Sequence, residues 1–327
     1  KFETAGTTIE ENDAIRVWTL DGEVLIASIK TKMHAISPEV CEGLMAAVDL
    51  AEQAYQGLVI WSGDEPFSAG ADLQAMLPAF MAVGVSAIED AEGFMQQTML
   101  RLRYASVPVV SAVRGLALGG GCEFQMHSAR AVFSLESYVG LVEAGVGLLP
   151  AGGGLKEIAV RASAAAGPGG DVFAALKPYF EAVAMGKVSA SALEAKELRL
   201  ARENDGVVFN QYELLHVAKA QVRALAESGY RPALPARQVQ VAGDVGIATF
   251  KMMLQNMLEG RFISEHDYEV SSRIATVLCG GEVDRGSIVD EEWLLKLERE
   301  HFIALAQMPK TQARILHTLK TGKPLRN

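Results

Sequence analysis

The stretch from Gly115 to Pro150 constrains this 327-residue chain more than any other part of it. It carries two glutamates, Glu123 and Glu143, which are 20 residues apart and each stand beside a cluster of glycines. Glycine allows a positive φ and lets a ligand approach the backbone closely. Backbone N–H groups that point into a cleft stabilise an oxyanion. Carboxylates in such surroundings indicate proton transfer.

Two motifs in this order resemble the crotonase (enoyl-CoA hydratase/isomerase) superfamily. The turn FSAGADL at residues 67–73 is similar to the family's F-x-A-G-A-D-[IL]. The pattern G-x-A-x-G-G-G-C-E ends at Glu123 and is followed by Glu143 and by P-x-G-G at residues 150–153. The resemblance implies an α/β fold, a crotonase-like spiral of ββα repeats. We expect this core at residues 1–228 and a helical C-terminal region at residues 229–327.

The resemblance also implies roles for individual residues. The N–H groups of Ala71 and Gly120 correspond to the family's oxyanion hole. Glu123 corresponds to the acid that activates water for attack at C3, and Glu143 to the acid that protonates C2. The implied reaction is syn addition of water to a trans-2-enoyl-CoA in fatty-acid β-oxidation, with the coenzyme A thioester as substrate and no separate cofactor. The implied substrate-binding residues are Lys32, Ala69, Asp72, Leu73, Gln74 and Ala151.

Two alternatives stay open at this point. Isomerases of the superfamily typically keep one acid near the second position, so the acid pair favours a hydratase over a Δ3,Δ2-enoyl-CoA isomerase. A non-catalytic acyl-CoA-binding module of a larger complex is the alternative of another class. By composition alone both glutamates would be solvated residues at helix ends, because most glutamates are exposed. Lys30 and Lys32 fit either contacts with CoA phosphates or a solvated strand end.

The sequence departs from the family pattern at positions that leave the acids and the donors in place. The family's Arg-Pro and Asn-Ala are Ile29-Lys30 and His34-Ala35 here, and its Asp after the first acid is Ala129. We interpret Cys122 as a small buried residue and His127 as a packing residue.

Hydrophobic periodicity and capping residues predict the remaining elements. Asp21-Gly22 lies between two β-rich runs and predicts a hairpin. Ser37-Pro38 predicts the start of a helix. The segment 162–170 predicts a loop, and residues 229–235 a linker. Strands are expected at 57–62 and 107–113, and helices at 38–56, 88–104, 123–128, 189–203, 211–228, 245–258, 264–278, 290–306 and 311–319.

Composition narrows the class of protein. The net charge of −10 and the pI of about 5.2 disfavour non-specific binding to nucleic acid, which requires phosphate neutralisation. Three scattered cysteines indicate a reducing, cytoplasmic compartment. The six histidines have no ligand-like spacing, so no metal site is expected. The longest charge-free run, Leu73 to Ile88, is shorter than the ~18 residues of a membrane span, and the polar N-terminus is not a signal peptide.

The tail from Gly280, together with GRFISEHDYE at residues 260–269, resembles the C-terminal end of fused 3-hydroxyacyl-CoA dehydrogenase/enoyl-CoA hydratase proteins. Because the chain begins at Lys1 and shows no G-x-G-x-x-G after a strand, we expect the natural polypeptide to extend into an NAD-dependent dehydrogenase. The resemblance also implies a homo-oligomer. The apolar stripe of the tail has to be buried, and consists of Trp293, Leu294, Leu297 and Phe302.

Overall fold

The computed structural model describes residues 5–78 and 85–327. Part of the charge-free run noted above, residues 79–84, lies outside the described residues. The chain forms two compact units. The sheet unit comprises Lys1–Asp72, Phe94–Gly140 and Val188–Leu234, and the helical unit comprises Leu73–Gly93, Leu141–Lys187 and Pro235–Asn327.

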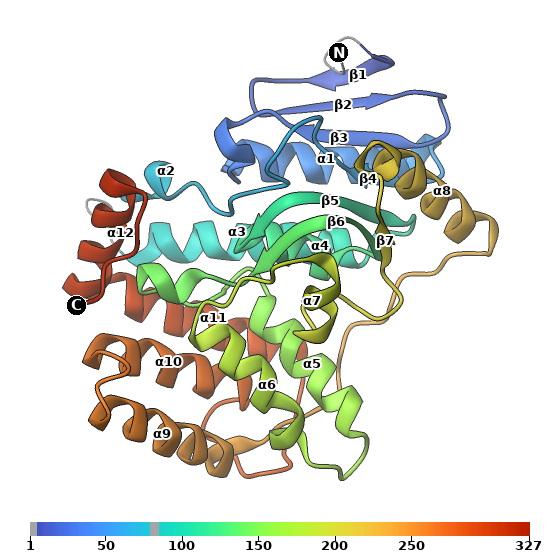
Figure 1. The fold of residues 1–327 in the computed structure, drawn as a ribbon. Coiled ribbons are helices and arrows are strands. Elements are labelled where there is room, and N and C mark those ends of the chain that lie inside the picture. Colours follow the sequence, from blue (N-terminus) through green and yellow to red (C-terminus); the bar gives the residue numbers. More distant parts are fainter. Residues whose placement is uncertain (1–4, 79–84) are drawn as a thin grey trace. The chain divides into compact units, whose positions relative to one another are not determined.

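A seven-stranded sheet with its strands in sequence order forms the sheet unit (Figure 1). The first three strands are antiparallel, and the predicted hairpin is confirmed, since Thr19 pairs with Leu25 across the turn. The pairs from β3 to β7 are parallel. The strands are β1 (Thr7–Glu11), β2 (Ile15–Thr19), β3 (Leu25–Ile29), β4 (Leu58–Ile60), β5 (Val109–Leu118), β6 (Arg130–Gly140) and β7 (Gly206–Val208).

Helices cover both faces of this sheet. The predicted start of α1 is confirmed, because the Ser37 hydroxyl accepts from the Val40 N–H and Pro38 occupies the first turn. On one face, Gly43 of α1 packs so closely on Ile15 that a side chain there would overlap it. The helices of the unit are η1 (Lys32–His34), α1 (Pro38–Ala54), α4 (Gly120–His127), α7 (Ala192–Glu197), η4 (Gln211–Glu213), α8 (Leu214–Glu227) and the second half of α3 (Val85–Arg103).

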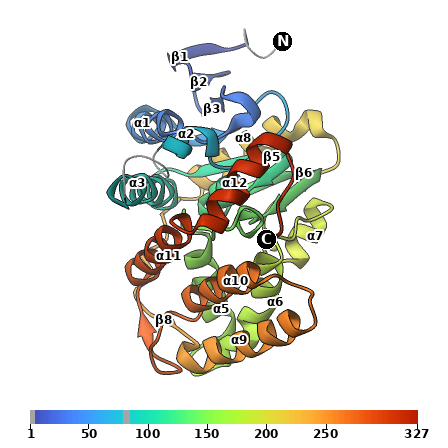
Figure 2. The ribbon, with the colours of Figure 1, turned by 90° about the vertical axis from the view of Figure 1, so that its left-hand side faces the viewer.

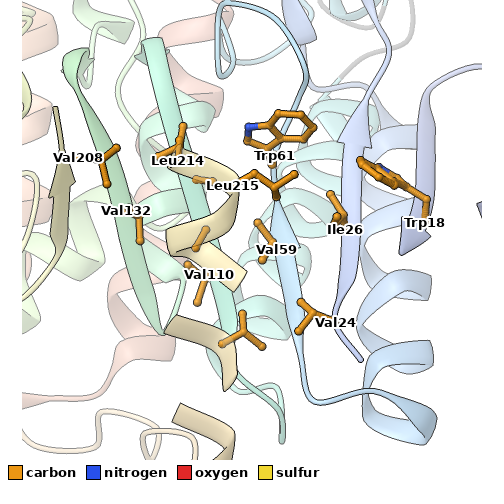
Figure 3. Packing of buried hydrophobic residues seen from close by; sticks show 13 residues of the cluster. Trp18, Val24, Ile26, Val59, Trp61, Val110, Val132, Val208, Leu214 and Leu215 are labelled. Carbon is orange, nitrogen blue, oxygen red and sulfur yellow. The ribbon is translucent and has the colours of Figure 1, made fainter. Parts of the chain in front are cut away.

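On the opposite face, alternate strand residues pack beneath α8 (Figure 3). Trp18 and Trp61 have ring centroids 6.2 Å apart, and Leu214 and Leu215 of α8 belong to the same buried cluster. The period-two alternation of the strands supplies this apolar layer.

The helical unit contains residues 73–93 and 141–187 together with the C-terminal helices beyond residue 234 (Figure 2). The four helices predicted beyond residue 244 are confirmed with ends within three residues. Leu294, Leu297 and Phe302 are buried as expected, whereas Trp293 is 39% exposed. The elements are α2 (Leu73–Pro78), the first half of α3, η3 (Glu143–Val146), α5 (Gly154–Ala166), α6 (Val172–Ala184), β8 (Val239–Gln240), α9 (Gly243–Glu259), α10 (Glu265–Leu278), β9 (Ile288–Val289), α11 (Glu291–Ala306) and α12 (Pro309–Thr321).

Several predicted elements have wrong boundaries. The strand expected at 107–113 extends to Leu118, and the helix expected from residue 88 begins at Val85. The expected loop at 162–170 begins only at Gly167, because the alanines before it continue α5. The expected helix at 189–203 ends at Glu197, where Arg199 adopts a left-handed φ of 60° and the Lys196 ammonium binds the carbonyls that follow. The helix expected from Glu123 begins three residues earlier, at Gly120. Within the described ranges, no helix combines the length and apolarity needed to cross a membrane.

Candidate active site

The turn at residues 67–73 lies as an extended segment between two other backbones. The Ile36 N–H donates to Gly70 O (2.9 Å) and the Asp72 N–H donates to Ile36 O (3.0 Å). On the other side, the Leu118 N–H donates to Ser68 O (3.0 Å) at the end of β5. Because Gly70 and Asp72 make the bonds to Ile36, the N–H group of Ala71 points away from it.

Gly120 brings a second N–H group to the same place. Gly119 turns the chain with a φ of 53°, and α4 begins at the next residue, so the Gly120 N–H belongs to the first turn and has no partner within the helix. A methyl group built on Gly120 would stand 3.9 Å from Ala71 N, and one built on Gly70 would stand 3.5 Å from Gly120 N. Among the described residues, neither the Ala71 nor the Gly120 N–H has a backbone acceptor.

Close approach, rather than unusual backbone geometry, explains two of the three glycines. Only Gly119 has a positive φ in this triplet. A methyl group on Gly120 would lie 2.8 Å from Ile36 Cδ1, and one on Gly121 would lie 2.8 Å from both Cβ and O of Ser68. The triplet therefore lets α4 start in contact with the 67–73 turn.

Glu123 lies in the first turn of α4 and is 2% exposed. Its N–H donates to Gly119 O (3.0 Å), and its carbonyl accepts from Nδ1 of the fully buried His127 (2.8 Å). Glutamates are rarely buried, and the positive end of a helix favours a negative charge at this position. The burial distinguishes Glu123 from a solvated residue at a helix end. Cys122 is fully buried, as expected of a small packing residue.

Several of the predicted substrate-binding residues lie at the surface around the 67–73 turn. Ala69 is exposed, and its N–H donates to Met33 O (3.1 Å), which ties the turn to η1. Lys32 is exposed and lines a cleft of about 730 Å³ in the sheet unit. Lys30 lines the same cleft and pairs with Glu11 at 2.8 Å. Asp72 is half-buried, and Leu73 and Gln74 open α2 of the helical unit.

Residues 33 and 34 have an unusual conformation that the sequence did not indicate. Met33 and His34 have φ values of 56° and 48°, in the left-handed region where non-glycine residues are uncommon. The His34 ring nitrogen Nδ1 contacts Pro66 O, and the Ser68 hydroxyl donates to His34 O (2.7 Å). The one available signal was that His34-Ala35 stands where the family has Asn-Ala, since Asn tolerates this region.

Glu143 belongs to the helical unit, where it opens η3 and is half-buried. Its carbonyl accepts from the Leu148 N–H (3.0 Å), and Gly147 closes the turn with a φ of 81°. Ala151, 4% exposed, precedes α5. The Glu298 carboxylate of α11 accepts from the Gly153 and Lys156 N–H groups (2.9 and 2.6 Å) at the start of that helix.

Comparison with known proteins decides the family. Residues 24–189 match the family model described as enoyl-CoA hydratase/isomerase. The chain belongs to the enoyl-CoA hydratase/isomerase family. It is 37% identical to a "Probable 3-hydroxyacyl-CoA dehydrogenase" of Bacillus subtilis over 325 residues. The matched region covers 99% of this chain and 41% of that protein. A "Putative fatty acid oxidation complex trifunctional enzyme" of Rickettsia felis is 29% identical and covers 92% of this chain and 38% of that protein.

The chain therefore spans about two fifths of the length of these relatives. A shorter relative, a "Crotonyl-CoA hydratase" of Syntrophomonas wolfei, is 39% identical over 103 residues, which are 31% of this chain and 37% of that protein.

Solved structures of this family confirm the predicted fold. The enoyl-CoA hydratase from Bacillus halodurans matches with a TM-score of 0.61 and 15% identity, over 93% of this chain and 99% of that one. An enoyl-CoA hydratase/isomerase from Xanthobacter autotrophicus Py2 also matches with a TM-score of 0.61, at 20% identity over 96% and 95% of the two chains. Within the described residues, no group of three His, Cys, Asp or Glu side chains is placed to hold a metal ion.

Proposed function

We propose that this chain is an enoyl-CoA hydratase, which adds water across the C2=C3 bond of a trans-2-enoyl-CoA to give a 3-hydroxyacyl-CoA in fatty-acid β-oxidation. Within the family, one observation supports this proposal most strongly. The backbone N–H groups of Ala71 and Gly120 lie close together at the start of α4, the helix that also carries the buried Glu123.

The two N–H groups suit the charge that develops during the reaction. Attack of water at C3 places enolate charge on the thioester oxygen, and donors that point at this oxygen stabilise the transition state more than the substrate. Loss of one such donor costs about 3–4 kcal/mol in other enzymes. In this proposal Ala71 and Gly120 bind the thioester oxygen.

Hydration then needs a base for the water and an acid for C2. Glu123 takes the proton from water as it attacks C3, and Glu143 delivers a proton to C2, with the Ala151 N–H helping to hold the water. Two carboxylates can divide these roles if their surroundings favour different protonation states.

The acid pair supports a hydratase over the two alternatives. A Δ3,Δ2-enoyl-CoA isomerase only moves a proton between carbons and needs no base for water, so it has no use for a second acid. A non-catalytic acyl-CoA-binding module would have no reason to keep Glu123 buried, since burying a carboxylate is costly.

The proposed hydratase function also implies a substrate and partners. Lys32, Ala69, Asp72, Leu73 and Gln74 would contact the coenzyme A part of the substrate, and no separate cofactor takes part. The product is a 3-hydroxyacyl-CoA, and the Bacillus subtilis relative is named as a 3-hydroxyacyl-CoA dehydrogenase. We therefore propose a dehydrogenase that is fused to this chain or works with it, and assembly as a homo-oligomer.

Hydration of crotonyl-CoA and longer 2-enoyl-CoAs, followed by loss of the conjugated thioester absorbance, tests the proposal. Glu123→Gln and Glu143→Gln should each lower kcat by roughly 10²–10⁴, the usual contribution of general acid–base catalysis. Binding of a saturated acyl-CoA should barely change. Glu136→Gln, at an exposed position of β6, is the matched control and should hydrate normally. Normal turnover in either acid variant, or activity of the chain with 3-enoyl-CoA alone, contradicts the proposal.

A further inference from the structure

The turn that carries Glu143 is held by side chains from much later in the sequence. Gly147 O accepts from the Thr311 hydroxyl (2.9 Å), and Ala144 O accepts from Nη1 of Arg314 (3.3 Å). Both donors lie on α12, 164 and 170 residues beyond their acceptors. Four-residue 3₁₀ turns have little stability of their own, so these two bonds matter for where η3 lies.

Thr311 is fully buried and forms the middle of a relay. Its hydroxyl hydrogen goes to Gly147 O, so Nε2 of His266, 2.9 Å from the hydroxyl oxygen, has to donate to it. Burial, with the nearby charges of Arg314 and Lys310, lowers the pKa of His266 to about 4, so the ring is neutral at pH 7. A neutral imidazole with its hydrogen on Nε2 satisfies the relay.

Arg314 is 1% exposed and is fixed by other groups of the helical unit. Its Nη1 pairs with Asp267 (2.8 Å), its Nη2 donates to the Ser264 hydroxyl (3.2 Å), and its Nε donates to the side chain of Asn327 (2.9 Å). Because the guanidinium is planar and held on three sides, the position of its bond to Ala144 O is also fixed.

We propose that Thr311 and Arg314, with His266 behind Thr311, are positioning residues that fix the η3 turn and thereby the carboxylate of Glu143. This inference rests on the proposed function, in which Glu143 protonates C2. A proton donor has to stay within about 0.5 Å of its productive position, and a misplacement of about 1 Å can cost 10²-fold in rate. In this view the C-terminal helices α10 and α12 are part of the catalytic apparatus, acting through main-chain carbonyls.

Two substitutions at one buried position test the inference. Thr311→Val keeps the shape but removes the hydroxyl, and Thr311→Ser keeps the hydroxyl. We expect Thr311→Val to lower kcat for crotonyl-CoA hydration about 10–100-fold with KM within about twofold, and Thr311→Ser to restore kcat to within about threefold. Ile315→Val, which removes a buried methylene from the same helix, controls for general destabilisation and should keep normal kcat.

A second measurement does not depend on activity. Hydrogen exchange in the peptide spanning residues 143–149 should be about tenfold faster in Thr311→Val than in the wild type, and unchanged in Thr311→Ser and Ile315→Val. Should Thr311→Val fail to fold, Arg314→Lys, which keeps the charge beside Asp267, is measured instead. We expect it to lower kcat with little change in KM and to speed hydrogen exchange at residues 143–149.

The outcomes separate the inference from the proposed function. A wild-type chain without hydration activity refutes the proposed function, while the exchange data still decide whether Thr311 fixes the turn. The inference is overturned if Thr311→Val leaves exchange and kcat unchanged, or if its kcat loss is matched by Ile315→Val.

Discussion

At the scale of single residues, Gly120 shows how one missing side chain shapes the site. A valine at this position would press on Ile36 and Met95 and fill the space beside the Ala71 N–H. We therefore predict that Gly120→Val abolishes hydration through loss of the oxyanion donor, which would be measured as kcat/KM with crotonyl-CoA. Normal turnover in a folded variant would show that Gly120 is not the donor.

Gly93 provides the matched control for this substitution. It lies within α3, where an added methyl group meets nothing within 4 Å. Gly93→Ala should keep its activity and gain up to about 1 kcal/mol of stability, because alanine is the better helix former. Comparing the activities of Gly120→Val and Gly93→Ala therefore separates the general effect of replacing a glycine from a specific effect on the candidate site.

At the scale of elements, the start of α5 depends on a side chain of α11. Glu298 is fully buried, and its carboxylate accepts two N–H groups at the beginning of α5. Glu298→Ala leaves these two N–H donors without that carboxylate. We predict a loss of about 3 kcal/mol in the free energy of unfolding, measured by urea denaturation.

The exposed Glu300 on the same helix is the control for Glu298. It forms a solvent-exposed pair with Lys296 at 3.7 Å, and such pairs contribute little. Glu300→Ala should stay within about 0.5 kcal/mol of the wild type. Equal losses in the two variants would show that the buried carboxylate has no special part in holding α5.

Elements with local signals could be predicted from the sequence, and contacts between distant segments could not. Ser264 and Asp290 cap α10 and α11, and both caps could be read from residue type and spacing. The end of α7 depends on Arg199, whose left-handed conformation has no signature in residue type. The bonds from α12 to η3 join residues far apart in the sequence, and no motif marks them.

The candidate site shows the same division. The two motifs identified Ala71 and Gly120 only through the resemblance to the family, because no local signal predicts a contact between segments about 50 residues apart. The roles of Glu123 and Glu143 stay predictions. The sequence located both acids, but it gave no indication of Thr311, His266 or Arg314, which act on the backbone of Glu143's turn rather than on a ligand.

At the scale of the whole molecule, chain order and compact units do not coincide. Glu123 belongs to the sheet unit and Glu143 to the helical unit, although only 20 residues separate them. The sequence placed a boundary at residue 228, and the helical unit combines the region beyond Leu234 with residues 141–187. Under the proposed function, each unit contributes one of the two acids.

The buried histidine of the helical unit makes the stability of the whole chain depend on pH. Burial, helped by the charges of Arg314 and Lys310, lowers the pKa of His266 from 6.5 to about 4 on folding. Between these two pKa values His266 is protonated in the unfolded chain and neutral in the folded chain. The free energy of unfolding therefore decreases as the pH falls from 6.5 towards 4. Between pH 7.5 and 5.0 this loss amounts to about 2 kcal/mol.

Urea unfolding of the wild type and of His266→Gln at these two pH values measures the effect. His301, whose pKa is also lowered by burial and by Arg273, adds to the slope in both proteins, as do the carboxylates, so the difference between the two slopes isolates His266. We predict that His266→Gln loses about 2 kcal/mol less than the wild type on going to pH 5.0. Equal slopes for His266→Gln and the wild type would mean that His266 already carries its proton in the folded chain, and Nε2 could then donate to Thr311 in either protonation state.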